Sequence, residues 1–218
     1  MILEFDGIEF SYDERQLLSG IYMKSETGKI TGLLGRNGSG KSTLLKLVFG
    51  SMRTEVISVR IDSIPLLPPA FTSKRIAYLP QENFVPKDLA LGKILQLYNI
   101  NEEDLICHFP ELKGNLSLKP GQLSGGGLRL FEILLILNSP ASFCLLDEPF
   151  TGLTPALIEQ VKVYIDEIKS NKGIIITDHL YRQVVSLSDS LYILTNGKTY
   201  LVKNEEDMIK RGYLPDQE

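Results

Sequence analysis

The chain contains few cysteines. Only two are present, Cys107 and Cys144, and they lie far apart within apolar stretches. A disulfide framework or a cysteine-based metal site needs closely patterned cysteines, so this composition excludes both. We interpret the two residues as small core side chains of a protein from a reducing compartment.

An excess of basic residues is also missing. The 23 lysine and arginine residues are outnumbered by 27 aspartate and glutamate residues, which gives a net charge of −4 and a pI of about 5.4. A nucleic-acid backbone is held mainly by clustered positive charge. Nucleic acid is therefore not expected as a partner.

Long apolar runs are absent as well. Spanning a bilayer takes about 18 to 20 apolar residues, and no stretch of this sequence reaches that length. The longest run, "LLILNSPASFCLL", is interrupted by Asn138 and Pro140. The N-terminus, "MILEFDGIEFSYDE", has neither the basic start nor the apolar core of a secretory signal. We expect no direct membrane insertion and a cytoplasmic protein, which would serve a membrane process only by docking on another subunit.

The first 34 residues alternate in the manner of β-strands. Turn signals occur at Asp6-Gly7, Ser19-Gly20 and Thr27-Gly28, so the pattern predicts a meander of antiparallel strands. From Phe143 onward, strands and helices alternate, which is typical of a parallel sheet with flanking helices.

Between these parts the pattern is helical. Residues 86–140 contain short helical stretches and no convincing strand. We predict an α/β fold: a parallel sheet with flanking helices, an N-terminal antiparallel β subdomain and an inserted helical lobe. The whole chain, 1–218, would form one domain, with its core in 1–85 and 141–218 and the lobe in 86–140.

A glycine-rich loop joins a strand to a helix. The segment Gly35–Ser42, "GRNGSGKS", fits the phosphate-loop pattern G-x-x-x-x-G-K-[ST]. Its glycines let the backbone curl so that N–H groups point at phosphate oxygens, and the helix adds its partial positive charge. Lys41 is expected to reach the β- and γ-phosphates, and the Ser42 hydroxyl to bind Mg²⁺. An ordinary glycine-rich turn is the alternative, which the strand-loop-helix context disfavours.

Two carboxylates end a later apolar strand. The segment "SFCLLDEPF" places Asp147 and Glu148 at the C-terminal edge of this strand, where α/β sheets bind ligands. Asp147 would hold Mg²⁺, directly or through water, and Glu148 would polarise the water that attacks the γ-phosphate. By itself the pattern fits a solvated acidic turn equally well. Together with the phosphate loop it favours a nucleotide site.

The segment "LSGG", Leu123–Gly126, consists mainly of serine and glycine, as flexible linkers do. Its position is unexpected for a linker, because a predicted apolar helix begins there. Two further polar residues follow strands, Gln81 after "RIAYLP" and His179 after "GIIITD". With this order of motifs, and "LSGG" as the most specific of them, the chain resembles the ATP-binding cassette (ABC) family. The resemblance is to the nucleotide-binding subunit of an ABC transporter, built on a P-loop NTPase core, and covers about Tyr12 to Leu201.

The resemblance implies an ATPase that works as a pair of cassettes. In such a pair, Ser124, Gly125 and Gly126 of one chain face the γ-phosphate held by the phosphate loop of the other. A hydroxyl, exposed N–H groups and the positive end of a helix suit that task.

Other roles follow from the same resemblance. Gln81 would sense Mg²⁺ and the γ-phosphate, His179 would contact the γ-phosphate, and the Tyr12 ring would stack on adenine. A half-buried strand tyrosine is the alternative for Tyr12. The predicted catalytic residues are Glu148, His179 and Gln81, and the predicted metal ligands are Ser42, Gln81 and Asp147. The predicted ATP-binding residues are Tyr12, Gly35, Arg36, Asn37, Gly38, Ser39, Gly40, Lys41, Ser42, Thr43, Ser124, Gly125 and Gly126.

The implied partners are a second cassette, as a homodimer, and transmembrane permease subunits. These would hold the chain on the inner face of the plasma membrane. The pieces "DEPFTGL" and "ITDH" look most similar to cassettes of lipopolysaccharide-export or branched-chain amino-acid transport systems.

Two positions depart from the family pattern. Gly127 stands where a glutamine is usual, and Thr154 in "TGLTP" stands where an aspartate is usual. Loss of a charge near the attacking water keeps open a second interpretation, a cassette that binds ATP and dimerises with little hydrolysis. A third is an ABC ATPase outside transport, for which a coiled coil, a second cassette or a basic surface would be expected.

Overall fold

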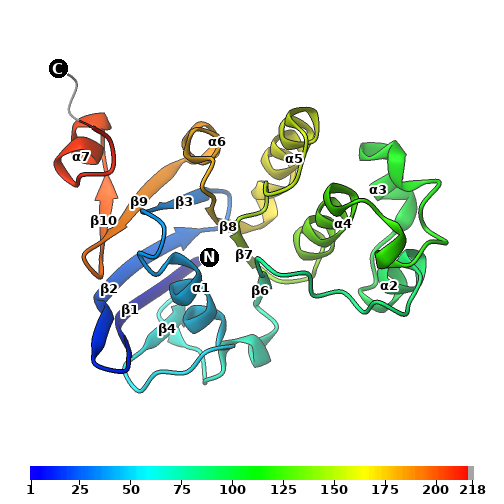
Figure 1. Ribbon diagram of the computed structural model, residues 1–218. Helices are drawn as coiled ribbons and strands as arrows, with labels where there is room; N and C mark the ends of the chain where they lie inside the picture. The colour runs from blue at the N-terminus through cyan, green and yellow to red at the C-terminus, as the bar shows by residue number, and fades with distance from the viewer. Residues whose placement is uncertain (216–218) are drawn as a thin grey trace.

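The computed structural model describes residues 1–215 (Figure 1). The strands are β1 (Ile2–Tyr12), β2 (Arg15–Glu26), β3 (Ile30–Leu34), β4 (Ser58–Ile61), β5 (Ile64–Pro65), β6 (Ile76–Leu79), β7 (Phe143–Asp147), β8 (Gly173–Thr177), β9 (Ser190–Thr195) and β10 (Lys198–Val202). The α-helices are α1 (Lys41–Phe49), α2 (Leu91–Leu97), α3 (Glu102–His108), α4 (Gly125–Leu137), α5 (Pro155–Ile168), α6 (Tyr181–Leu187) and α7 (Glu205–Lys210). Short 3-10 helices occupy Ala70–Ser73, Pro110–Leu112, Pro120–Gln122 and Lys169–Asn171.

The strands form two sheets. The larger has the order β10-β9-β3-β8-β7-β6, and the smaller has the order β2-β1-β4-β5. In the larger sheet β9, β3, β8, β7 and β6 run parallel, whereas β10 pairs with β9 as an antiparallel hairpin. The predicted α/β class, with a parallel sheet and an antiparallel β subdomain, is confirmed.

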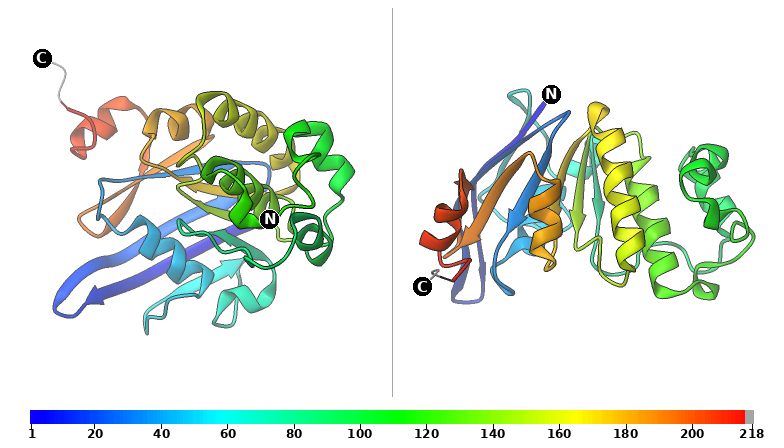
Figure 2. Two further views of the ribbon diagram at one scale, coloured as in Figure 1. Left: turned by 45° about the vertical axis from the view of Figure 1, so that its right-hand side comes forward. Right: turned by 90° about the horizontal axis from the view of Figure 1, so that it is seen from above.

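The six-stranded sheet has a hydrophobic core on each face, because successive side chains of a strand point to opposite sides. In β8, Ile175 belongs to the core shared with α1 and the small sheet. Its neighbours Ile174 and Ile176 belong to the core shared with α4, α5 and α6. Figure 2 shows α5 and α6 along one side of the sheet. Helices therefore cover both faces, and the carboxyl ends of the parallel strands stay free to carry a site.

The predicted meander is wrong in two respects. Asp6-Gly7 and Ser19-Gly20 lie inside β1 and β2, where Gly7 and Gly20 are the unpaired residues of register shifts. Both glycines have positive φ angles, +62° and +70°, so they mark bulges in a continuous hairpin rather than turns. The third strand, β3, leaves the hairpin and pairs with β8 and β9 in the larger sheet. The turn at Thr27-Gly28 is confirmed.

The segment between β6 and β7 is helical, as its sequence pattern predicts. Helices α2 and α3 lie at the end of the molecule opposite α7 (Figures 1 and 2). Phe109 anchors this part, because its buried ring packs edge-on against Tyr164 of α5 with centroids 5.3 Å apart. Since one hydrophobic cluster contains residues of α2, α3, α4 and α5, the division of the chain at 86 and 140 stays a prediction.

The two cysteines differ in their surroundings. Cys144 is buried in β7, as predicted, whereas Cys107 is exposed on α3, so its assignment to the core is wrong. Helix α3 buries only Leu105, and its other side chains are exposed or partly exposed. Within residues 1–215, no helix combines the length and apolar character needed to cross a bilayer.

Candidate nucleotide-binding site

The phosphate loop lies between the fully buried strand β3 and helix α1. Gly38 and Gly40 have φ angles of +76° and +104°, which L side chains rarely adopt, so the curl of the loop requires glycine there. The Lys41 ammonium donates to the Gly35 carbonyl at 2.9 Å and to the Arg36 carbonyl at 3.4 Å. Its charge is thereby held within the curl of the loop.

Lys41 carries a positive charge into a shielded position, since only 8% of its surface is exposed. Burial lowers the pKa of its ammonium group, while the nearby Glu148, Asp147 and Asp178 act against that shift. An anion placed over the loop would meet an incompletely hydrated cation and several N–H groups. This is the environment that a triphosphate needs.

Asp147 is fully buried at the end of β7 and is held by two hydroxyl groups. Ser42 donates to Oδ1 at 3.0 Å, and Tyr78 donates to Oδ2 at 2.9 Å. Burial raises the pKa of Asp147, against the effect of these two hydrogen bonds. Burial, together with the Asp147 charge, also raises the pKa of Tyr78, so the phenol stays a donor.

The pair Ser42 and Asp147 suits a magnesium ion brought by a nucleotide. Mg²⁺ prefers oxygen ligands and keeps few protein ligands, taking the others from phosphates and water. Within residues 1–215, no group of three or more His, Cys, Asp or Glu side chains could hold a metal ion. The Ser42 Oγ and Asp147 Oδ1 atoms lie 3.0 Å apart, and these two oxygens would be the few protein ligands that such an ion needs.

The three predicted catalytic side chains lie together beside this pair. The Gln81 amide donates to Oε2 of Glu148 at 2.7 Å. His179 Nδ1 lies 3.6 Å from the same oxygen. Glu148 has a positive φ of 50°, and its N–H donates to the Thr177 carbonyl at 2.8 Å. The backbone after β7 thus turns sharply and directs this carboxylate toward Gln81 and His179.

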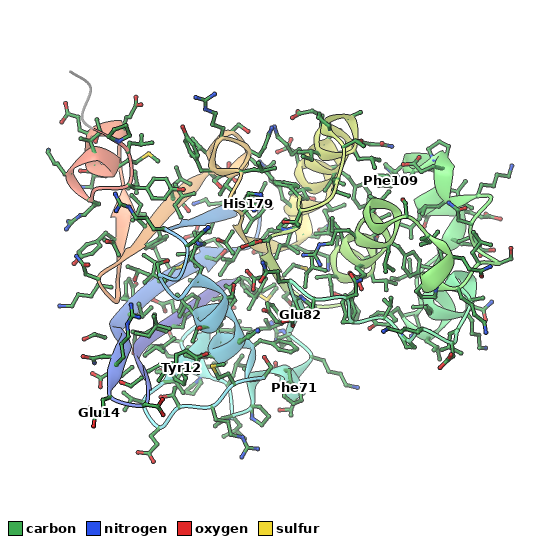
Figure 3. All side chains as sticks on the ribbon, viewed as in Figure 1. Tyr12, Glu14, Phe71, Glu82, Phe109 and His179 are labelled. Carbon is green, nitrogen blue, oxygen red and sulfur yellow. The ribbon has the colours of Figure 1, made fainter. Side chains whose placement is uncertain are left out.

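An open cleft of about 590 Å³ joins these groups. Tyr12 lies at its edge with 52% of its surface exposed, and its ring packs edge-on against Phe10 at 4.9 Å. Figure 3 labels Tyr12 and His179, which come from β1 and from the segment after β8. The predicted site residues in the lining are Tyr12, Asn37, Gly38, Gly40, Lys41, Ser42, Thr43, Gln81, Glu148 and His179.

Other predicted residues lie elsewhere. The Arg36 guanidinium donates to the Gly212 carbonyl at 2.7 Å and so faces the end of α7, and Arg36 lines a neighbouring pocket with Ser39. Any contact of Arg36 with a nucleotide in this arrangement would come from its backbone. Gly35, like Asp147, is not part of the described cleft lining; its carbonyl supports Lys41.

Ser124, Gly125 and Gly126 are also outside the described lining of this cleft. Ser124 is the N-cap of α4, where its Oγ accepts a hydrogen bond from the Gly127 N–H at 3.1 Å. Ser124 and Gly125 are exposed. A side chain at Gly126 would place its Cβ 2.7 Å from the Gly152 carbonyl oxygen, so close packing requires glycine there.

Sequence reasoning missed Arg129, which is 5% exposed on α4. Its guanidinium donates to three backbone carbonyls, those of Pro80 at 2.7 Å, Asp147 at 2.7 Å and Glu148 at 3.0 Å. The buried Glu132 lies 3.6 Å away and balances its charge. One side chain therefore ties the "LSGG" helix to the segment before Gln81 and to the backbone of Asp147 and Glu148. The available signal was a charged pair at i and i+3 inside the apolar stretch "GLRLFEILLIL".

Known proteins with similar sequences and structures are ATP-binding proteins of ABC transporters. The family model described as "ABC transporter" matches residues 18–151. The chain is 32% identical to the lipopolysaccharide export system ATP-binding protein LptB of Haemophilus influenzae, over 99% of this chain and 98% of that protein. It is 30% identical to the high-affinity branched-chain amino acid transport ATP-binding protein BraG of Pseudomonas aeruginosa, over 90% of each chain.

A solved structure described as "Structure of ATP binding subunit of ABC transporter" has a TM-score of 0.85 and 25% identity, and the match covers 99% of this chain and 95% of that one. The chain belongs to the ABC transporter family. It is an ATP-binding subunit of the kind that hydrolyses ATP to drive transport, and such subunits work with a partner cassette and a membrane permease. The predicted resemblance is confirmed, including its two suggested groups of relatives.

Proposed function

We propose that this chain binds ATP with Mg²⁺ in the cleft over the phosphate loop and hydrolyses it there. The observation that carries the proposal is the convergence of Lys41, Ser42 and Glu148 on one cleft, with the buried Asp147 hydrogen-bonded to Ser42. Lys41 and the loop N–H groups would hold the phosphates, and the exposed ring of Tyr12 would take the adenine.

The catalytic roles follow from the positions of the side chains. Glu148 is the general base, because its carboxylate opens into the cleft and has a hydrogen-bond partner in Gln81. His179 and Gln81, which both lie near the Oε2 atom of that carboxylate, would orient the γ-phosphate and the attacking water. Ser42 and Asp147 would hold Mg²⁺, which when bound offsets the negative charge of the phosphates.

The working unit in this proposal is a homodimer of cassettes in head-to-tail arrangement. Ser124 and Gly125 are exposed at the N-terminal end of a 13-residue helix and do not line the described cleft of their own chain. Their hydroxyl, N–H groups and helix dipole would complete the γ-phosphate site of the partner. Each site then needs both chains.

A groove beside the Gln81 segment is our proposed docking site for the permease. It has a volume of about 970 Å³ and is lined largely by apolar side chains, among them Phe49, Phe71, Tyr78, Phe84, Leu97 and Ile136. Figure 3 labels Phe71 on this part of the surface. A short amphipathic segment of a permease, on the cytoplasmic face of the membrane, would bury this apolar surface. The cargo would be set by that permease, since relatives of similar identity are named for lipopolysaccharide export and for amino-acid transport.

Gly127 and Thr154, the two residues that depart from the family pattern, both take part in N-terminal helix caps. The Gly127 N–H donates to Ser124 and so completes the cap of α4. Thr154 caps α5 by accepting a hydrogen bond from the Leu157 N–H at 3.4 Å. Because both helix starts are formed and Lys41, Glu148 and His179 all line the cleft, we favour an active ATPase over a cassette that only binds ATP.

Substitution of Lys41 tests the proposal. Lys41→Ala removes a charge-assisted contact from a shielded phosphate site, so ATP binding at micromolar nucleotide should become undetectable by calorimetric titration. The exposed Lys198 offers the control Lys198→Ala, which should bind like the wild type. Unchanged affinity in Lys41→Ala would refute the site. ATP binding by the wild type without phosphate release at any protein concentration would favour the cassette with little hydrolysis.

A further inference from the structure

Tyr78 stands between the proposed docking groove and the proposed metal carboxylate. It lies in β6 with 8% of its surface exposed, and its hydroxyl donates to Oδ2 of Asp147 at 2.9 Å. The other oxygen, Oδ1, accepts from Ser42. Tyr78 thus fixes the rotation of the carboxylate and leaves Oδ1 on the side of the phosphate loop.

The ring of Tyr78 belongs to a different surface. It packs against Phe49 with centroids 5.4 Å apart, and Phe49 packs against Phe71 with centroids 5.5 Å apart. All three rings line the groove proposed for the permease. One side chain therefore contributes its ring to the groove and its hydroxyl to Asp147.

The hydroxyl is not needed to fill space, because phenylalanine would place the same ring between the same neighbours. A buried phenol has to find a partner or lose stability. Here the partner is a buried carboxylate whose second acceptor atom is directed at the phosphate-loop serine. Groups that orient a metal-binding carboxylate contribute to metal affinity as well as to packing.

We propose that Tyr78 is a positioning residue that orients Asp147 for the divalent cation and couples the occupancy of the groove to the cation site. The proposal rests on the function proposed above and adds a specific route between permease and nucleotide. Pressure on Phe71 or Phe49 would move the Tyr78 ring, and the hydroxyl would carry that movement to the carboxylate. Because coupling is reciprocal, cation binding must also change the groove.

The first test uses Mn²⁺ as a paramagnetic probe and does not depend on turnover. Tyr78→Phe should weaken Mn²⁺ binding to the ADP complex, measured by electron paramagnetic resonance, by about 10- to 100-fold. ADP affinity without any divalent cation should stay at the wild-type value. The matched control is Tyr98→Phe, because Tyr98 lines the same groove, and this variant should bind Mn²⁺ like the wild type.

Three outcomes separate the possibilities. Wild-type Mn²⁺ affinity in folded Tyr78→Phe would overturn the positioning role. A variant that melts lower but keeps its Mn²⁺ affinity would show that the hydroxyl serves stability alone, which also overturns it. A wild-type chain that binds no ADP would instead contradict the proposed function, before the role of Tyr78 is reached.

The coupling has a second test that uses the lack of tryptophan in this chain. Phe71→Trp places the only tryptophan of the variant in the groove, at a side chain that is 42% exposed, and excitation at about 295 nm avoids the tyrosines. Adding Mg²⁺ to the ATP-bound reporter should shift its emission beyond the effect of ATP alone. In Phe71→Trp combined with Tyr78→Phe, the Mg²⁺-dependent part should disappear at saturating Mg²⁺. A full shift without the hydroxyl, or none in the reporter with Tyr78 intact, would overturn the coupling.

Discussion

The side-chain amide of Gln81 donates to the Oε2 atom of Glu148 at 2.7 Å, although the two residues belong to segments that follow different strands. The contact holds the proposed base with a neutral donor, which leaves Oε1 free to accept a proton from water. It also ties the segment that borders the permease groove to the residue proposed to activate the water.

Glu148→Gln should separate binding from hydrolysis. The amide keeps the shape of the side chain and can still accept from Gln81, but it is not a base. Phosphate release should fall by about 10² to 10⁴, while calorimetric ATP affinity stays near the wild-type value. Glu159→Gln, on the exposed side of α5, is the matched control. Near-normal turnover of Glu148→Gln would mean that another group activates the water.

Mixing two inactive variants should restore activity if each site is shared between chains. Ser124→Arg would block the partner's γ-phosphate site, and Lys41→Ala would disable the chain's own phosphate loop. In a mixed dimer both lesions fall in one site, and the other site is intact. Phosphate release should therefore partly recover on mixing, and the wild-type rate per subunit should rise with protein concentration. Concentration-independent hydrolysis by a strict monomer would contradict the shared site.

Arg129→Ala should be strongly destabilising. The change leaves Glu132 buried without its countercharge and removes the donors of three carbonyls. The free energy of unfolding in urea should fall by about 3 to 5 kcal/mol. Adding Glu132→Ala to Arg129→Ala should recover part of this loss. As a control, Arg53→Ala at an exposed position should change the free energy of unfolding by less than about 0.5 kcal/mol. Equal stability of Arg129→Ala and Arg53→Ala would exclude the proposed role of the buried guanidinium.

Two neighbouring glycines should respond differently to the same substitution. A Cβ at Gly125 meets no atom within 4 Å, whereas a Cβ at Gly126 lies 2.7 Å from the Gly152 oxygen. Gly126→Ala should lower the free energy of unfolding by about 1 to 3 kcal/mol. Gly125→Ala should change it by less than about 1 kcal/mol, but should weaken the ATP-dependent dimer seen by light scattering. Equal unfolding curves for both variants would contradict the close packing at Gly126.

Short motifs were sufficient to predict that Lys41, Ser42, Asp147 and Glu148 lie close together, because the chemistry of such motifs fixes residue type and spacing locally. The register shifts at Gly7 and Gly20 were not predictable in the same way. From the sequence of one strand, a glycine is interpreted as a turn, because a bulge can be recognised only from the partner strand. The bulges at Gly7 and Gly20 depend on the register between β1 and β2, which neither strand sets by itself.

The Arg36 and Arg129 side chains show the same limit at the site. Arg36 lies inside the phosphate-loop motif, yet its guanidinium contacts Gly212, which is 176 positions away in sequence. Arg129 contacts carbonyls of two strand ends that meet α4 only in the folded sheet. Local pattern carries no information about such partners, because tertiary packing decides them.

The contact between Arg36 and Gly212 has a consequence for the order in which the subunit becomes functional during synthesis. The ribosome makes the phosphate loop early, but β3 receives its neighbours only when β8 and β9 have emerged, and Arg36 receives its partner later still. An unfinished chain therefore carries the motif without the surroundings that hold it in shape. The phosphate loop can therefore reach the arrangement described here only after Gly212 has been made.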